Sequence, residues 1–173
     1  MKQVLIQPLT AESFARYGTF QNLLDISDLE QKSVTSGGFF ADVLSLDFGK
    51  RTLPTVSVCY VTKQPRNIVS FVEAHQETCE GLLPLDADIV IFVGAMGWGE
   101  CSSDSLEAFL VPKGTFVKLN PLILHGKQYL LDAEQAHIAC FLPMRTFRND
   151  TLYKDLSESE QVELVTQKPA AYT

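Results

Sequence analysis

Three polar side chains capable of acid–base or metal chemistry stand close together in a largely apolar stretch of the chain. Phe71–Val93 reads FVEAHQETCEGLLPLDADIVIFV and carries Glu73, His75 and Glu80 in its first half. Residues two apart leave the same face of an extended strand, so Glu73 and His75 are expected to share a face. A later glycine-punctuated strand pair carries His125, which would join them if the two hairpins face each other inside a barrel.

Imidazoles and carboxylates in one pocket suit a divalent first-row ion such as Zn, Ni, Mn or Fe. The predicted metal ligands are His75, His125 and Glu80, and the predicted catalytic base is Glu73 or Glu80. Burying such groups is costly unless they are paired or bound to a metal. The alternative is that the two glutamates are solvated at strand ends and that His75 is an edge residue.

Several other residues in this part of the chain could belong to the same pocket or have a structural role. Lys127 and Tyr129 alternate with His125 and could line the same pocket as a cation and a phenol for an acidic substrate, or lie on the surface. His137 opens the last clear strand and is expected to be structural. The sequence also leaves open whether Trp98 covers a pocket or forms a subunit contact.

Two arginines follow the last clear strand. Arg145 and Arg148 could bind a carboxylate with paired hydrogen bonds, although a solvated rim is the favoured role.

These residues are set among short strands that recur at about 8–12 residue spacing, with helices only near the two ends. This pattern predicts an all-β fold, an antiparallel sandwich or barrel. The expected helices cover about residues 10–18, with Thr10 as N-cap and Gly18 as the terminating residue, and about 157–165. The segment Asn22–Lys32 fits either a loop or a short helix. The expected strands are Val4–Ile6, Phe39–Phe48, Thr55–Val61, Ile68–Val72, Ile89–Val93, Leu106–Val111, Phe116–Leu119, Ile123–His125, Gln128–Leu131 and His137–Leu142, with turns at Leu82–Asp88 and Pro112–Gly114.

Composition narrows the class of protein. The 173 residues suit a single domain, 1–173, with a loose C-terminal tail, and 46% hydrophobic residues are enough for a sizeable core. A net charge of −7 without a basic cluster argues against nucleic-acid binding. The absence of a secretory leader or a long apolar run predicts a cytoplasmic protein with no membrane span. None of the four cysteines forms a CxxC pair, and Cys59 and Cys140 are expected to be buried, inert thiols.

The two histidine regions resemble the conserved regions of cupins. Glu73-Ala-His75, followed by Glu80-Gly-Leu-Leu-Pro84, is similar to the first cupin region, and Pro112-Lys-Gly114 followed by His125 is similar to the second. Within cupins the chain resembles the ureidoglycolate lyase family, on Pro8–Gly18 and Leu106–Gly114. It departs from that family at Leu124-His125-Gly126-Lys127, where the family has Trp-His-His-Pro.

The resemblance implies a cupin-type antiparallel β-barrel, a homodimer, and a lyase that splits ureidoglycolate into glyoxylate and urea in purine (allantoin) catabolism. The diverged second region keeps two alternatives open. One is a cupin isomerase or epimerase acting on a sugar or sugar phosphate, and the other is a non-catalytic cupin that binds a small molecule. The expected partner is therefore a small acidic or sugar-like substrate.

Overall fold

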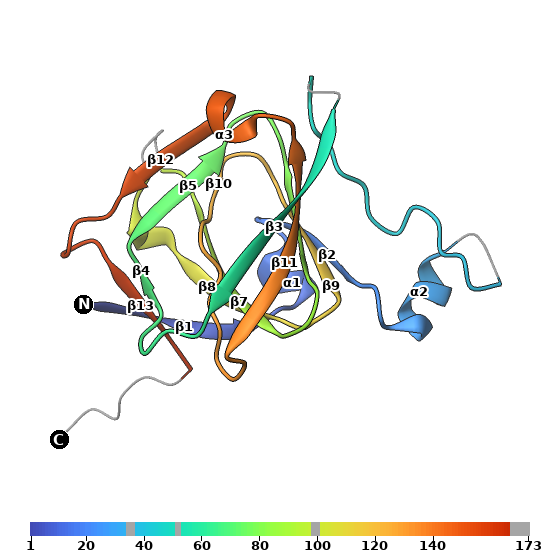
Figure 1. Cartoon of the computed structure of the whole chain (residues 1–173), viewed down its shortest axis with the longest axis horizontal. Coiled ribbons are helices and arrows are strands. Elements are labelled where there is room, and N and C mark those ends of the chain that lie inside the picture. The colour runs from blue at the N-terminus through green and yellow to red at the C-terminus, as the bar shows by residue number, and fades with distance from the viewer. Residues whose placement is uncertain (34–36, 51–52, 98–100, 167–173) are drawn as a thin grey trace.

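The fold is a β-barrel with a few short helices (Figure 1). The computed structural model describes residues 1–33, 37–50, 53–97 and 101–166. Its helices are α1 (Ala11–Phe14), α2 (Ile26–Lys32), a 3-10 turn Ser103–Ser105 and α3 (Thr146–Asn149). Its strands are β1 (Lys2–Pro8), β2 (Gly18–Asn22), β3 (Pro54–Thr62), β4 (Ile68–Val69), β5 (Phe71–His75), β6 (Glu80–Pro84), β7 (Ile89–Ala95), β8 (Glu107–Val111), β9 (Thr115–Leu119), β10 (Ile123–Leu124), β11 (Gln135–Pro143), β12 (Thr151–Asp155) and β13 (Val162–Val165).

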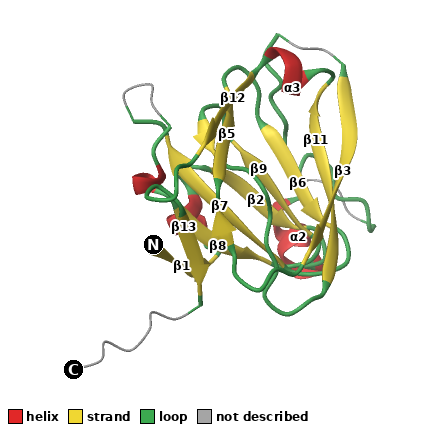
Figure 2. Ribbon diagram, turned by 60° about the vertical axis from the view of Figure 1, so that its left-hand side comes forward, coloured by secondary structure: helices red, strands yellow, loops and turns green. Residues whose placement is uncertain are grey.

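Two curved sheets enclose the core, as Figure 2 shows. The six-stranded sheet has the order β10-β7-β8-β1-β13-β4, and the five-stranded sheet has the order β2-β9-β6-β11-β3. A two-stranded sheet, β12-β5, completes the wall. The all-β, cupin-type barrel expected from the sequence is therefore confirmed.

Strand β7 explains why the stretch Ile89–Val93 lacks alternation. Ile89 and Ile91 pack into the core between the two sheets, whereas Val90 and Phe92 pack into a second apolar cluster on the outer side of the strand. A strand that is buried on both faces needs apolar residues at every position.

The barrel is antiparallel except around β1. Strand β1 pairs in parallel with β8 through Ile6–Pro8 and with β13 through Lys2–Leu5. Strands β8 and β13 are far from β1 in the sequence, so no turn next to β1 predicts these pairings.

The first helix is shorter than expected, although its N-cap is correct. Thr10 accepts a hydrogen bond from the Ser13 backbone, and the Ser13 side chain completes a capping box. Gly18 does not end the helix but begins β2. A Cβ atom there would lie 1.8 Å from the backbone oxygen of Lys118, so glycine is required by close strand contact.

The predicted C-terminal helix at 157–165 is wrong. Ser157 does accept two backbone hydrogen bonds, from Glu160 and Gln161, but the chain makes only this turn. Residues Val162–Val165 then form β13, with Val162 and Leu164 buried on one side. The apolar residues of this short segment alternate with a period of two, as in a strand, and β1 has a free edge for it to pair with. These two effects outweigh the helix-capping signal at Ser157.

The structure also corrects three further predictions of strands and turns. The described part of Phe39–Phe48 contains no strand, and residues 128–131 make only an isolated bridge, between Tyr129 and Val90. The first three residues of the expected turn Leu82–Asp88 belong to β6, so the turn is confined to residues 85–88. The undecided segment Asn22–Lys32 contains α2, capped by Asp25.

Within the described residues, no helix has the length and apolar character needed to cross a bilayer.

Candidate active site

Three neighbouring segments bring the predicted ligands together. On β5, Glu73 and His75 share a face, as expected, while Val72 and Ala74 on the opposite face pack into the second apolar cluster. Glu80 opens β6 and shares the face of Leu82, which belongs to the core between the sheets. His125 follows β10 and is held against β5, because the backbones of Glu73 and His125 exchange two hydrogen bonds of 2.9 Å.

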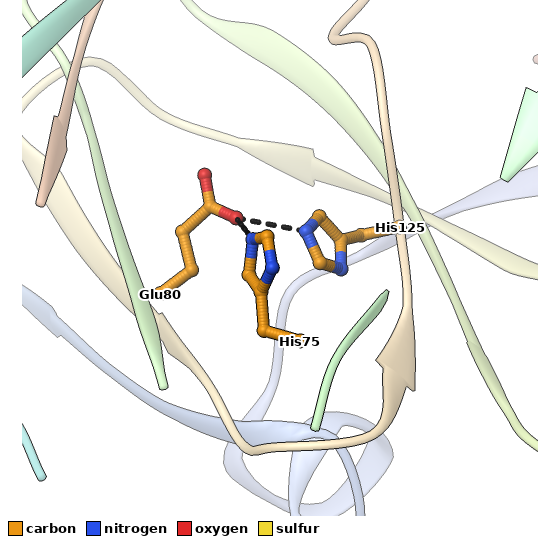
Figure 3. Close-up of side chains that lie close together, drawn as sticks. All are labelled: His75, Glu80 and His125. Atoms are coloured by element: carbon orange, nitrogen blue, oxygen red, sulfur yellow. Dashed lines mark hydrogen bonds and ion pairs between the residues drawn. The ribbon is translucent and has the colours of Figure 1, made fainter. Parts of the chain in front are cut away.

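The side chains of His75, Glu80 and His125 converge on one point (Figure 3). Glu80 Oε2 lies 3.2 Å from His75 Nε2 and 2.8 Å from His125 Nε2. One ligand atom from each residue lies within 4.8 Å of the others, and all three residues are buried. The alternative that Glu80 is solvated at a strand end is therefore wrong, and His75 is a buried residue rather than an exposed residue at an edge.

Hydrogen bonds fix which ring nitrogen of each histidine faces Glu80. His125 Nδ1 lies 2.8 Å from the carbonyl oxygen of Ile123, so Nδ1 must donate. His75 Nδ1 lies 3.3 Å from the Thr151 hydroxyl, which itself donates to the carbonyl of Thr146. Both Nε2 atoms are thus left for Glu80, for a proton or for a metal ion, which is the orientation that metal-binding histidines have.

The Nε2 atom of His125 is close to Glu80 but has no well-directed hydrogen bond. Its 2.8 Å distance to Oε2 is that of an ion pair, and this buried atom has no hydrogen-bond partner among the described residues. A buried polar atom without a partner is costly. A metal ion held by two imidazoles and one carboxylate would satisfy it, so the residues fit a divalent ion.

Without a metal, charge balances the site. Burial alone would raise the pKa of Glu80, but the adjacent His125 and His75 lower this pKa to about 2. Burial alone would lower the pKa of His125, but the carboxylates of Glu80 and Glu73 raise this pKa to about 9. The metal-free centre is therefore a carboxylate–imidazolium pair.

Glu73 stands apart from this pair. Its carboxyl group is largely withdrawn from water, and this burial raises its pKa above the ordinary value, while His125 partly opposes the rise. A carboxylate with a raised pKa next to a metal site is a typical general base.

A cavity of about 460 Å³ opens beside the centre. Glu73 and Glu80 both line it, so a molecule in the cavity would reach Glu73 and the carboxylate of the buried centre together. Its walls come mainly from β3, β5, β11 and the segment after His125; the lining residues are Ser57, Val58, Cys59, Tyr60, Val61, Phe71, Glu73, Glu80, Gly126, Lys127, Gln128, Cys140 and Phe147.

Lys127 and Tyr129 do not share the cavity. Lys127 lines it and is exposed, but Tyr129 is buried in the second apolar cluster and donates its hydroxyl to the carbonyl of Ile68 at 2.7 Å. The regular alternation expected after His125 fails because this segment is not a strand. We therefore leave Tyr129 out of the proposed catalytic groups.

The remaining predicted side chains lie outside the cavity lining. His137 is paired with Asp86, its Nδ1 lying 2.6 Å from the carboxylate, which agrees with a structural role. Arg145 precedes α3 and Arg148 lies in its last turn, and both are exposed. Trp98 falls outside the described residues.

Sequence reasoning missed the contribution of α3 and β12. Strand β12 lies beside β5 (Figure 1), and their pairing sets Thr151 opposite His75. Asp150 accepts hydrogen bonds from the backbones of Gln76 and Glu77, which fixes the turn between His75 and Glu80. Phe147 makes an edge contact with His75. No local pattern in the sequence predicts these contacts.

Comparisons with known proteins give only weak similarity. No protein-family model matches the chain, and no curated protein matches it. Solved structures that share part of the fold include an RmlC from Streptococcus suis in complex with dTDP-D-xylose, at 10% identity and TM-score 0.40 over 53% of this chain and 44% of that one. A dTDP sugar isomerase from Desulfovibrio desulfuricans G20 has 13% identity and TM-score 0.45 over 67% and 74% of the two chains.

A third such structure is the dTDP-6-deoxy-D-glucose-3,5-epimerase RmlC from Legionella pneumophila Philadelphia 1 in complex with dTDP-4-keto-L-rhamnose. It has 11% identity and TM-score 0.38 over 66% of this chain and 55% of that one. The chain spans only about half the length of the two RmlC proteins. None of these similarities assigns an activity, and none of the three proteins is a ureidoglycolate lyase. Strand topology and site geometry define the chain as a cupin-type β-barrel with a buried centre of two histidines and one glutamate.

Proposed function

We propose that the chain is a metal-dependent enzyme of the isomerase or epimerase type, acting on a small, sugar-like hydroxycarbonyl compound. The observation that carries this proposal is the position of Glu73. Its partly desolvated carboxyl group lines the same cavity as Glu80, which belongs to the buried His75–Glu80–His125 centre. A base and an electrophile side by side are what proton abstraction next to a carbonyl requires.

Each group has a defined task in this reaction. His75, Glu80 and His125 would hold a divalent ion, such as Zn, Ni, Mn or Fe, that polarises the substrate carbonyl. Glu73 takes the proton from the neighbouring carbon and returns it to the same carbon or to the next one. Because burial raises the pKa of Glu73 above its ordinary value, the carboxylate is a stronger base than a solvated glutamate.

The cavity walls favour a sugar-like substrate over ureidoglycolate. Phe71, Tyr60 and Phe147 line the cavity and provide aromatic surfaces for the apolar face of a sugar ring. Among the described lining residues, the single cationic side chain is Lys127, which is exposed. A small carboxylate such as ureidoglycolate would thus find no buried cationic side chain among the described lining residues. Lys127 suits a phosphate at the mouth of the cavity, at the end of a longer substrate.

Deuterium exchange tests this proposal directly. The purified protein, loaded in turn with each candidate metal, is incubated in D₂O with a panel of aldoses, ketoses, sugar phosphates and ureidoglycolate. We expect metal-dependent deuterium incorporation next to the carbonyl of a sugar-like compound, measured by NMR, and its loss in Glu73→Gln. The exposed carboxylate variant Glu77→Gln is the matched control and should keep the exchange.

Two results would contradict the proposal. Release of urea from ureidoglycolate, without deuterium incorporation into any sugar, would support the ureidoglycolate lyase activity instead. A protein that purifies without metal, gains none on incubation and shows no effect of a chelator would be the non-catalytic binding cupin.

A further inference from the structure

Two thiols meet on the wall of the cavity. Cys59 lies on β3 and Cys140 on the adjacent strand β11, and their Sγ atoms are 3.5 Å apart. The register pairs Cys59 with Ile138 and Cys140 with Ser57, so the two cysteines are diagonal neighbours across the strand pair. Both side chains line the cavity that contains Glu73 and Glu80.

The two thiols differ in access to solvent. Cys140 is almost completely buried, whereas Cys59 is only partly buried. Cys140 donates its S–H to Cys59, and this hydrogen bond lowers the pKa of the Cys59 thiol. Cys59 is therefore the thiol that a reagent in the cavity meets first, and Cys140 stands directly behind it.

We propose that Cys59 and Cys140 form an oxidisable dithiol that a peroxide converts to a disulfide within the cavity wall. The Cys59 sulfur attacks one peroxide oxygen, the O–O bond breaks, and sulfenic acid and water are formed. The Cys140 sulfur then attacks the Cys59 sulfur, the S–O bond breaks, and a second water leaves. The two thiols lose two electrons and two protons, and the peroxide is reduced to two molecules of water.

The position of β3 allows this closure. The sulfur atoms must approach from 3.5 Å to about 2.0 Å, the length of a disulfide bond. Among the described strands of its sheet, β3 is at the edge and pairs with β11 alone, so it can shift without breaking a second ladder within the same chain. The expectation that both cysteines are buried is wrong for Cys59, which is only partly buried, and the proposal sets an oxidisable pair against the expectation that both are inert.

The test uses a variant in which Cys79 and Cys101 are replaced by serine, so that only Cys59 and Cys140 remain. The protein is treated with a small excess of hydrogen peroxide in the presence of a chelator, then denatured and alkylated. We expect complete loss of alkylation, a mass lower by two hydrogens, and a Cys59–Cys140 peptide that reappears as two peptides after reduction. Cys59→Ser and Cys140→Ser, each in the same background, should form no intramolecular disulfide.

Wild-type protein provides the second measurement. After the same treatment it should retain two alkylatable thiols, Cys79 and Cys101, and contain the same cross-linked peptide. Two free thiols in the treated background variant with the fold intact, or oxidation of Cys59 to sulfinic acid without a cross-link, would overturn the proposal. A disulfide that involves Cys79 or Cys101 in the wild type would do the same. Because neither metal nor substrate takes part, these outcomes are independent of the proposed enzyme activity.

Discussion

The buried glutamate Glu80 is the centre of the site at the scale of single residues. Both histidines direct Nε2 toward its Oε2 atom because their Nδ1 atoms are engaged elsewhere, by the carbonyl of Ile123 and the hydroxyl of Thr151. The two Nδ1 contacts thus determine that Nε2 of each histidine faces Glu80. Residues that hydrogen-bond to the ligands play this orienting role around metal centres.

Thr151 offers a test of that role. Thr151→Val keeps the side-chain shape but removes the hydroxyl near His75 Nδ1, so the ring loses a group that fixes its orientation. We expect metal affinity to fall about 10–100-fold, measured by calorimetric titration. Thr19→Val, at an exposed position on β2, is the control and should bind as the wild type does. Equal affinity in both variants would show that Thr151 does not position His75.

The charge pair predicts how the stability of the metal-free protein depends on pH. The pKa of Glu80 is lowered to about 2 from 4.5, so its stabilisation is present above pH 4.5 and is lost as pH falls toward 2. The pKa of His125 is raised to about 9 from 6.5, so its stabilisation is present below pH 6.5 and is lost as pH rises through 9. Urea unfolding with a chelator present should show the greatest stability between these limits, and Glu80→Gln should flatten the profile. A wild-type profile without this maximum would exclude the pair.

At the scale of elements, β5, β6 and the residue after β10 carry the predicted ligands, and β12 supports them from outside. The backbone exchange between Glu73 and His125 makes the placement of His125 a consequence of strand pairing. The turn between His75 and Glu80 is fixed by Asp150, which precedes β12. Each ligand therefore depends on backbone contacts, and rigid elements position a site more accurately than loops do.

Close packing of β2 on β9 predicts a strong effect of a single methyl group. Gly18→Ala would place Cβ 1.8 Å from the backbone oxygen of Lys118, so the strands must separate. We expect a loss of roughly 2–3 kcal/mol in the free energy of unfolding, measured with urea. Gly97→Ala is the matched control, because no atom of the described residues lies within 4 Å of its added Cβ. Equal effects of the two substitutions would contradict this packing.

At the scale of the whole molecule, the five-stranded sheet ends in an apolar edge. Strand β3 carries no charged residue over Pro54–Thr62, and Val56, Val58 and Tyr60 are 67%, 61% and 56% exposed. Long, uncharged edge strands readily pair with another chain. Antiparallel pairing of two copies about Val58 would set Val56 of each against Tyr60 of the other, with no like charges opposed.

We expect two copies of the chain to form a homodimer along this edge. Val58→Lys places a charge at the centre of the pairing and should convert the dimer to a monomer in sedimentation velocity. Thr19→Lys puts the same charge on β2, at the other edge of the sheet, and should leave the dimer intact. A wild-type monomer, or a dimer that survives Val58→Lys, would contradict this interface.

Local patterns in the sequence determined the parts of the molecule that depend on neighbouring residues. The two-residue spacing placed Glu73 and His75 on one face, Thr10 capped α1, and Gly114 adopts the positive φ of 78° that its turn requires. Tertiary structure alone decided the rest. The meeting of Thr151 with His75, the contact of Cys59 with Cys140, and the pairing of β13 with β1 each join segments far apart in the chain. Such pairings depend on which strand edge is free and on which apolar face needs cover, and neither property is encoded in a short segment.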